Sequence, residues 1–367
     1  MLAPVEFARF GTTVLTEPSA VTHDVGDLDA GGRWAVVVTF EGRLTAVRFD
    51  RMGEGGPPPS PTWQPPAEPW HSSLDRDAYI AGVETIRRHV ADGTVYQVNL
   101  CRVLSTPLPR TSHLPALAPL LDAGNPAPFA GTIHVPEAGL DVVCASPEAY
   151  LLRDGDRLVS RPIKGTGRER ADLGAKDHAE NVMITDLVRN DLGQVAVPGT
   201  VETASLCAVE EHPGLLHLTS EVCGRVRPGA GWGEILAATF PPGSVSGAPK
   251  SSALRIIGDL EPVPRGPYCG AIGWVDAYAG SAALAVGIRT FWVEESGEGR
   301  VLRFGTGAGI TWGSDARAEW SETELKAERL LALAAGDGEG VSVLPQSGAA
   351  SSRGLMPRSQ ASARVTP

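Results

Sequence analysis

The sequence lacks paired cysteines. Its 367 residues include five cysteines, an odd number, and no two of them form a CxxC pair; they are Cys101, Cys144, Cys207, Cys223 and Cys269. Disulfide-stabilised secreted domains and structural zinc sites use even or closely spaced sets of cysteines, so this pattern argues against both classes. We expect a reduced protein without a structural zinc ion.

Long apolar runs are also absent from the sequence. No stretch is apolar enough over a sufficient length to cross a bilayer. The first residues, MLAPVEFARFGTT, lack the basic start and apolar run of a secretory signal. These absences predict a soluble, cytoplasmic protein with no membrane contact.

Basic residues are fewer than acidic residues in this sequence. The chain has 32 Lys and Arg residues against 43 Asp and Glu residues, a formal net charge of −11. A general nucleic-acid binder needs a basic face, so that class is disfavoured. A small anionic substrate remains compatible, because a local cluster of cations or a bound metal reverses the field.

The length and the 42% hydrophobic content allow one large domain or two ordinary ones. We predict a short β-rich segment over residues 1–52, in which residues 34–49 form a hairpin. Seven prolines between Gly53 and Trp70 predict an extended connector over residues 53–70. The main domain covers residues 71–335, and residues 336–367, of which 18 of 32 are Gly, Ala, Ser or Pro, predict a disordered tail.

Hydrophobic spacing predicts the elements of the main domain. Apolar residues recur at helical spacing from Tyr79 to Val90, with Ser72 or Ser73 as the expected cap and Gly93 as the expected end. Further helices are predicted over residues 177–192, 232–239 and 315–335. Strands are predicted over residues 94–104, 141–145, 157–160, 271–278, 282–293 and 301–309. Because strands and helices do not alternate in a βαβ rhythm, we predict an α+β fold with large mixed or antiparallel sheets.

Lys164 lies in an unusual setting for a lysine. In SRPIKGT its close neighbours are proline, isoleucine and glycine, and only Arg161 is charged. An amine held out of water loses its proton more easily and becomes a nucleophile. Glu148, in ASPEAYL, precedes apolar residues, and a carboxyl group in such a setting stays protonated and suits a general acid. On spacing alone, a structural ion pair between neighbouring strands is the simpler interpretation.

Carboxylates lie on two predicted helices. Glu180 shares a helical stripe with Ile184, and Glu319 and Glu322 are three residues apart on one face. Carboxylates from two helices, with open positions left for water and substrate, suit Mg²⁺. The alternative is ordinary solvated helix charge, which is the simpler interpretation for Glu324 and Glu328.

The glycine-rich segment FGTGAGIT allows backbone N–H groups to approach an anion. It is not a dinucleotide fingerprint, because Ile310 stands in place of the third glycine. The segment PPGSVSGAPKSS contains Lys250, but Ala248 and Pro249 break the phosphate-loop pattern.

Three single residues are weaker candidates. Arg289 lies in a predicted apolar strand, where an arginine needs an anion or a structural partner such as Asp276. Tyr268 and His217 are each more often satisfied core residues. The segment around Gln97 and Asn99 places two amides on one face of a buried strand, which suggests the wall of a polar cavity.

Taken together, these segments resemble the chorismate-utilising enzymes. The resemblance runs from about Asp75 to Leu333 and rests on YQVNL, SPE, SRPIKGT, DHAENVMITDLVRNDLG, HLTSEVCGRV, FPPGSVSGAPK, GIRT and GTGAGITWGSD followed by EWSET. The family resemblance implies two packed, mostly antiparallel β-sheets with helices on the outside and the active site between them.

Within this family the resemblance is to the large subunit, component I, of 4-amino-4-deoxychorismate synthases. Anthranilate synthases typically have alanine at the position of Lys164. Isochorismate and salicylate synthases typically have a water-activating lysine at the position of Gln97, and no LLES-type tryptophan-sensing segment is present. Trp320 and Gln194 depart from the family's usual tyrosine and arginine. Anthranilate synthase, a water-using isochorismate-type enzyme and a non-catalytic chorismate-binding subunit remain alternatives.

The resemblance also implies roles for individual residues. Lys164 would be the nucleophile, Glu148 the acid, and His217 a neighbour of the reacting edge of the ring. Glu180 and Glu322, supported by Glu319 and Asp177, would hold Mg²⁺. The substrate-binding residues would be Arg289, Tyr268, Gly307, Ala308, Gly309, Thr166, Gln97 and Lys250. The chain shows no glutaminase module, so we expect a separate glutamine amidotransferase partner that supplies ammonia.

Overall fold

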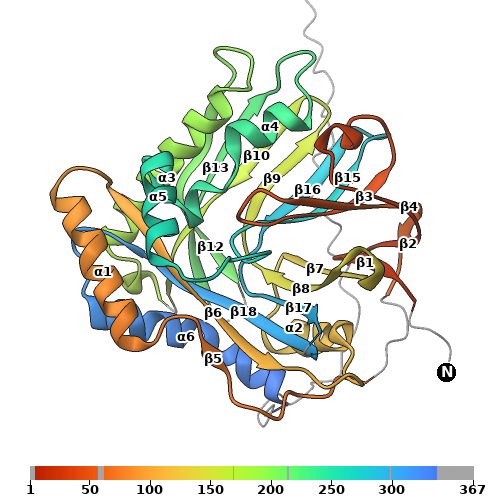
Figure 1. The fold of residues 1–367 in the computed structure, drawn as a ribbon. Helices are drawn as coiled ribbons and strands as arrows, with labels where there is room; N and C mark the ends of the chain where they lie inside the picture. Colours follow the sequence, from red (N-terminus) through yellow and green to blue (C-terminus); the bar gives the residue numbers. More distant parts are fainter. Residues whose placement is uncertain (1–4, 57–61, 168, 213–214, 298, 337–367) are drawn as a thin grey trace, which may run out of the picture. The chain divides into compact units, whose positions relative to one another are not determined.

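Antiparallel strand pairing organises this protein (Figure 1). The computed structural model describes residues 5–56, 62–167, 169–212, 215–297 and 299–336. The strands are β1 Phe7–Phe10, β2 Thr13–Thr22, β3 Arg33–Val38, β4 Leu44–Glu54, β5 His71–Ser72, β6 Gln97–Pro107, β7 Phe129–Val135, β8 Leu140–Ser146, β9 Ala149–Asp154, β10 Arg157–Arg161, β11 Ile163–Gly167, β12 Glu202–His212, β13 Leu215–Arg225, β14 Gly247–Ala248, β15 Ala271–Asp276, β16 Ser281–Val286, β17 Thr290–Ser296 and β18 Gly299–Ile310.

The pairings form one continuous antiparallel path, β13–β10–β9–β16–β15–β3–β4–β2–β1–β7–β8–β17–β18–β6. Strands β11 and β12 add to β13, and β5 and β14 add to β6. The predicted α+β fold with mostly antiparallel strands is confirmed. The pairings join the described strands into one continuous sheet, and different helices pack against its two ends.

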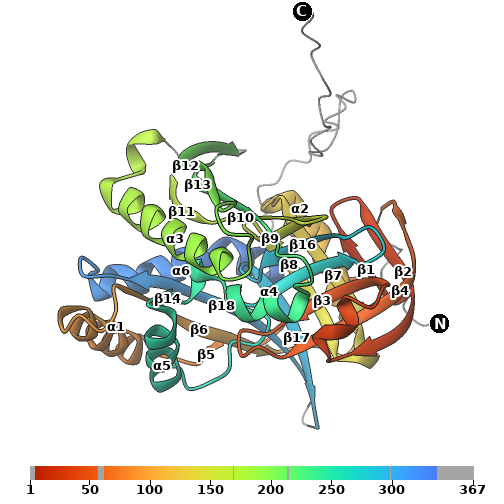
Figure 2. The same cartoon turned by 90° about the horizontal axis from the view of Figure 1, so that it is seen from above.

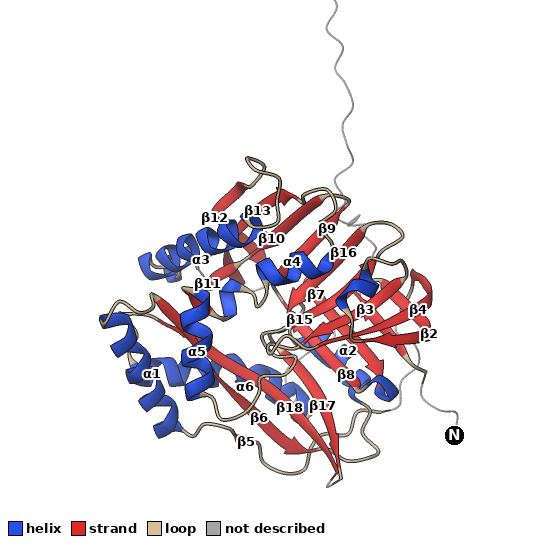
Figure 3. Ribbon diagram, turned by 45° about the horizontal axis from the view of Figure 1, so that its top comes forward, coloured by secondary structure: helices blue, strands red, loops and turns tan. Residues whose placement is uncertain are grey.

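Helices cover each end of the path (Figure 3). They are α1 Arg76–Ala91, α2 Ala118–Gly124, α3 Ala175–Gly193, α4 Trp232–Thr239, α5 Lys250–Leu260 and α6 Ala316–Ala335. Helix α3 packs against β11, β12 and β13, whereas α1 and α5 pack against β6 and α6 packs against β18. No described helix combines the length and the apolar character that a membrane span requires.

The N-terminal strands belong to the same sheet as the rest of the chain. Strand β1 pairs with β7, and β3 pairs with β15, so the predicted segment over residues 1–52 is not a separate sheet. Figure 2 shows β2 and β4 far from α1 and α5. In the connector, the buried indole of Trp63 donates to the carbonyl oxygen of Ala334 at 2.9 Å. The described residues, which end at Gly336, belong to one compact unit, and the predicted tail beyond Gly336 lies outside the described residues.

Helices α1, α3, α4 and α6 lie where the sequence predicts them, but the cap of α1 was predicted wrongly. The cap is Asp75, whose carboxylate accepts from the backbone N–H of Ala78 at 2.8 Å. Ser72 lies in β5, and the hydroxyl of Ser73 accepts from the backbone N–H of Val103. Helices α2 and α5 were not predicted, because each is short and follows or contains proline.

The predicted strand over residues 282–293 is two strands. Strand β16 ends at Val286 and β17 begins at Thr290, and Arg289 between them has a positive φ of 53°. A left-handed backbone at a non-glycine residue costs free energy and must be held by its surroundings. Arg289 therefore lies in a strained bend rather than inside a strand.

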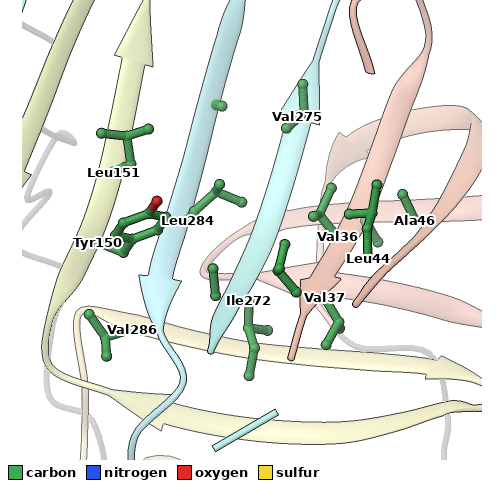
Figure 4. Packing of buried hydrophobic residues seen from close by; sticks show 14 of the residues in the cluster. Val36, Val37, Leu44, Ala46, Tyr150, Leu151, Ile272, Val275, Leu284 and Val286 are labelled. Carbon is green, nitrogen blue, oxygen red and sulfur yellow. The ribbon is translucent and has the colours of Figure 1, made fainter. Parts of the chain in front are cut away.

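The main core lies between the strands and α3 and α4. Figure 4 shows part of it, where Val36, Ile272 and Leu284 come from neighbouring strands. Alternate residues of these strands point to this core because side chains in a strand alternate between its faces. The ring of Tyr150 belongs to the same cluster and brings a hydroxyl group into it.

A second buried feature is a pair of histidines, His113 and His134, next to Asp141. His134 lies on β7 and Asp141 lies on β8. The Nε2 atoms of His113 and His134 are 3.1 Å apart, and His134 Nδ1 is 3.0 Å from Asp141 Oδ1. Arg300 donates to the other carboxylate oxygen of Asp141 at 3.2 Å. One of the two facing Nε2 atoms must be unprotonated to accept a hydrogen bond. Burial lowers the pKa of His113 to about 4, and the neighbouring His134 adds to this.

This arrangement predicts a pH-dependent stability. Because the folded pKa of His113 lies below its unfolded value, the folded state binds fewer protons, so stability falls as pH decreases from about 6.5 towards 4. His113→Gln removes this titration. At pH 7 the free energies of unfolding of the wild type and this variant, measured with urea, differ by a certain amount. We expect this difference to become smaller as the pH is lowered to 4.5. His71→Gln, at an exposed position, is the control, and a pH-independent difference for His113→Gln would contradict the prediction.

Candidate active site

The two ends of the strand path meet at one backbone carbonyl group. The carbonyl oxygen of Ser244, in the short helix η5 (Gly243–Val245), accepts from Lys164 Nζ at 3.1 Å. It also accepts from Asn99 Nδ2 at 3.2 Å. Lys164 lies on β11 at one end of the path, and Asn99 lies on β6 at the other. The amine of Lys164 is thus held at the junction of segments far apart in the sequence.

Lys164 is partly buried, and its surroundings are mostly acidic. Burial lowers the pKa of its ammonium group, and the ammonium group of Lys326 adds to this. The carboxylates of Glu180, Glu148 and Glu322 act in the opposite direction. The net shift of the Lys164 pKa is downward. A larger fraction of Lys164 is therefore uncharged at a given pH than for a lysine on the surface.

Glu148, between β8 and β9, is 4% exposed. Burial raises the pKa of its carboxyl group to about 7, although the Ser244 hydroxyl and Lys164 each lower it in part. Its position is fixed by its backbone, because Glu148 N–H donates to Ser146 Oγ and its carbonyl oxygen accepts from Val286 N–H. A carboxylic acid that is half-protonated near neutral pH suits proton donation.

Two acidic helices face Lys164. The ammonium group of Lys176 lies between Glu180 on α3 and Glu319 on α6, at 3.8 Å and 3.3 Å. Burial raises the pKa of Glu180. Glu322 binds Lys326 at 2.7 Å. Burial raises the pKa of Glu322, but the ammonium groups of Lys326, Lys176 and Lys164 together outweigh this effect, and the net shift of the pKa is downward.

Lysine is rare in this chain, and all four lysines lie in this region. Only Lys164, Lys176, Lys250 and Lys326 are lysines among the 32 basic side chains. Three of them surround the carboxylates, and Lys250 binds the nearby Asp191 at 2.7 Å. The sequence analysis did not use this scarcity, which would have drawn attention to Lys176 and Lys326.

The carboxylates have the oxygen chemistry that Mg²⁺ prefers. An ammonium group between Glu180 and Glu319 marks a point where a cation is stabilised. Among the residues that the structure describes, however, no three His, Cys, Asp or Glu side chains are grouped closely enough to form a metal site. The carboxylates thus have suitable donor atoms for Mg²⁺, but in this arrangement they are bound by Lys176 and Lys326 and are not grouped as a metal site.

The whole domain matches a known family. Residues 42–332 match the family described as chorismate binding enzyme. The chain belongs to this family. It is 37% identical over 275 residues to the aminodeoxychorismate synthase component 1 of Klebsiella aerogenes, covering 71% of this chain and 59% of that protein. It is 38% identical over 274 residues to the anthranilate synthase component 1 of Thermus thermophilus, covering 71% and 57%.

Solved structures agree on the fold. The anthranilate synthase component I of Streptococcus pneumoniae superposes with a TM-score of 0.73 at 22% identity, covering 90% of this chain and 93% of that one. The menaquinone-specific isochorismate synthase of Escherichia coli gives a TM-score of 0.73 at 17% identity, covering 90% and 88%. The chain spans about three fifths of the length of the curated relatives it matches.

In this chorismate-binding enzyme, the glycines of β18 let β6 side chains approach closely. A Cβ atom at Gly309 would lie 2.4 Å from Gln97 Nε2, and one at Gly307 would lie 2.5 Å from Cys101 Sγ. The glycine-rich segment is thus part of the β18–β6 ladder and not a free loop. Its pairing with β17 starts only at Phe304, so the second edge of residues 305–310 is open among the described strands, and its outward N–H groups are available to an anion.

Three more of the predicted site residues, Tyr268, Arg289 and His217, are at least partly buried. Tyr268 is buried, and its ring packs against Gly305 of β18. Arg289 is partly buried, with Nη1 3.5 Å from Asn125 Oδ1. His217, buried on β13, is paired in register with Thr166, two residues from Lys164; the side chain of Thr166 is outside the described part.

Two predicted residues have partners other than the expected ones. Asp177 lies at the start of α3 and accepts from the backbone N–H of Gly174 at 2.9 Å, so one of its oxygens is already used. Lys250 donates to Asp191 Oδ2 at 2.7 Å and to the carbonyl oxygen of Thr239 at 3.1 Å, and its role in binding substrate stays a prediction. Gln97 is fully buried, and its Oε1 makes no hydrogen bond with the described residues.

The close approach at Gly309 is testable. Gly309→Ala forces Gln97 to move in a packed site, and such overpacking costs roughly 1–3 kcal/mol. We expect urea unfolding to show this loss. Gly313→Ala is the matched control, because its Cβ atom would meet nothing within 4 Å. Equal stabilities of the two variants would contradict the proposed contact.

Proposed function

We propose that this chain is the chorismate-aminating component of an aminodeoxychorismate synthase, converting chorismate and ammonia into 4-amino-4-deoxychorismate. The observation that carries the proposal is the Lys164 amine, held on the Ser244 carbonyl oxygen and flanked by Glu148 and the acidic helices. Without Lys164, the same site would suit direct attack by ammonia or water.

In the first step, the neutral amine of Lys164 attacks ring carbon 2 of chorismate. The ring double bonds shift, and the bond from carbon 4 to its hydroxyl group breaks. Glu148 gives its proton to the departing hydroxyl, which leaves as water. A pKa of about 7 for Glu148 supports this role, since the carboxyl group is protonated in a large share of molecules at neutral pH.

In the second step, ammonia attacks carbon 4 and the double bonds shift back. The bond from carbon 2 to Lys164 breaks, and the lysine leaves as an amine. Splitting one difficult substitution into two easier ones is the advantage of a covalent intermediate. The buried histidine on β13, His217, would lie beside the reacting edge of the ring.

Chorismate carries two carboxylates, and the chain offers positive groups for them. Arg289, Tyr268 and the open backbone edge of Gly307–Gly309 would hold one carboxylate. Gln97 and Thr166 would contact the ring substituents. Gln97 has a buried, unpartnered amide oxygen among the described residues, which supports a role in accepting a hydrogen bond from the ligand.

Mg²⁺ would be held by Glu180 and Glu322, with Glu319 in support. When bound, the ion would neutralise a substrate carboxylate and make the ring a better acceptor of electrons. These glutamates would orient the substrate so that ring carbon 2 faces Lys164.

Ammonia must arrive uncharged, because ammonium has no lone pair with which to attack. The relatives named component 1 support the existence of a second component. We propose a separate glutamine amidotransferase subunit that delivers ammonia to this site.

Anthranilate synthase is the second candidate, because relatives of that name match with similar identity. The two reactions differ in whether pyruvate is released. The purified chain is incubated with chorismate, Mg²⁺ and an ammonium salt at high pH. The product mass is determined, and pyruvate is followed with lactate dehydrogenase. We expect an amino product that keeps its enolpyruvyl group, and no reaction with glutamine alone; stoichiometric pyruvate would favour anthranilate synthase.

Lys164→Ala tests covalent catalysis. Removing the nucleophile should slow product formation by roughly 100-fold or more, while chorismate binding changes little. Rapid-quench mass spectrometry should detect a chorismate-derived adduct on Lys164 in the wild type and not in the variant. Full activity in Lys164→Ala would rule out the covalent step.

Glu322→Gln tests the metal assignment. Loss of one carboxylate ligand should raise the dissociation constant for Mg²⁺ by roughly tenfold or more, measured by titration calorimetry. Lys176→Met should lower it, because the competing ammonium group is removed from between Glu180 and Glu319. Glu328→Gln on the exposed side of α6 is the control, and unchanged Mg²⁺ binding in Glu322→Gln would exclude this ligand.

A further inference from the structure

A small cavity is lined in part by Glu148. Lys164 is not among its lining residues. The centre of a water-sized molecule can occupy a volume of about 20 Å³ in this cavity. About 10–15 Å³ of such space is enough for one water molecule. Its polar lining comes from Glu148, Tyr150, Ser160, Asp191, Thr239 and Ser244.

The hydroxyl of Ser244 points to a ligand in this cavity. Ser244 is 5% exposed, and its Oγ makes no hydrogen bond of normal geometry with any described residue. It lies close enough to the Glu148 carboxyl group to affect its protonation, but without such a bond. A buried hydroxyl group without a partner is costly, and a small polar molecule would satisfy it.

An ion pair also borders the cavity. Asp191 on α3 lines it, and its Oδ2 accepts from Lys250 Nζ on α5 at 2.7 Å. The side chain of Asp191 is 7% exposed and that of Lys250 is 17% exposed, so the lysine is the member nearer to solvent.

Tyr150 and Thr239 complete the polar wall. Thr239 Oγ1 donates to the carbonyl oxygen of Ile235 at 2.8 Å, so the Tyr150 hydroxyl donates to Thr239 Oγ1 at 2.6 Å. The Tyr150 oxygen is then left as an acceptor for a molecule in the cavity. Burial raises the pKa of Asp191 to about 6 against the effect of Lys250, close to the value of about 7 for Glu148. Proton transfer between two such groups costs little free energy.

We propose that a water molecule in this cavity connects Glu148 to the Asp191–Lys250 pair and that the pair restores the proton of Glu148 after each turnover. Asp191 and Lys250 do not touch the substrate and act only through Glu148. This inference rests on the proposed function, in which Glu148 gives its proton to the departing hydroxyl group.

The transfer is balanced. After the hydroxyl group leaves as water, the Glu148 carboxylate takes a proton from the cavity water. The Asp191 carboxylate takes a proton from the Lys250 ammonium group and passes it to that water, which replaces the proton that the water gave up. Lys250 is reprotonated from solvent with the proton that the added ammonia releases, so no net proton is gained or lost.

Rapid-quench kinetics at pH 6.5 test the relay, with chorismate, Mg²⁺ and an ammonium salt in enough excess that its small uncharged fraction at this pH does not limit turnover. At that pH most Glu148 carboxyl groups already carry a proton, so the first turnover does not need the relay. In Asp191→Asn we expect a burst of product close to one equivalent per site, followed by a steady-state rate at least roughly tenfold below that of the wild type. Two results would overturn the relay. In one, Asp191→Asn slows the first and the later turnovers by the same factor; in the other, it slows neither.

Two further variants separate the relay from a loss of folding. Asp191→Asn combined with Lys250→Met removes both charges together and should show the same burst. Val188→Leu keeps every charge but fills the cavity that Val188 lines, and should also slow only the later turnovers. Asp186→Asn, on the exposed side of the same helix, is the matched control and should turn over like the wild type.

A crystal structure of the wild type gives a readout that does not depend on turnover. We expect an ordered water molecule within hydrogen-bonding distance of Ser244 Oγ, Glu148 and Asp191. A dry cavity would overturn the relay whether or not the chain consumes chorismate. A chain that does not consume chorismate at all would instead contradict the proposed function.

Discussion

The candidate site depends on one contact, the hydrogen bond from Lys164 Nζ to the Ser244 carbonyl oxygen. Asn99 donates to the same oxygen, so this single acceptor joins β11 and β6 at opposite ends of the strand path. Each end supplies chemistry that the other lacks: the amine comes with the β13 end, and the amides come with the β6 end. The fold therefore has to close before an active site exists.

The charges around the site explain the unusual use of lysine. The chain has arginine at 28 of its 32 basic positions and keeps lysine only at this site and beside it. A guanidinium group is protonated at any physiological pH, whereas an ammonium group can lose its proton or exchange partners. In the proposed mechanism, Lys164 uses the first property for nucleophilic attack. Lys176 and Lys326 need the second if a metal ion is to replace them at the carboxylates.

The family assignment and the reaction rest on different kinds of information. The match over residues 42–332 and the superposed structures concern the whole domain. Anthranilate, aminodeoxychorismate and isochorismate synthases share that domain, so the fold alone does not select a reaction. The selection depends on local chemistry: an amine with a lowered pKa at Lys164, and a neutral amide at Gln97 where a base would activate water.

The sequence by itself determined the α+β class and the helices α1, α3, α4 and α6, because hydrophobic period is a local property. It named Glu148 and Lys164 as candidates, but on spacing alone a structural ion pair was the simpler interpretation. It did not reveal the bend at Arg289, since an apolar run continues across the residues where the two strands separate. It also did not reveal the ion pair of Lys250, whose partner Asp191 lies 59 residues earlier. Only the tertiary structure decided which lysine meets which carboxylate, because ion pairs and pKa shifts depend on distances and burial that no local pattern contains.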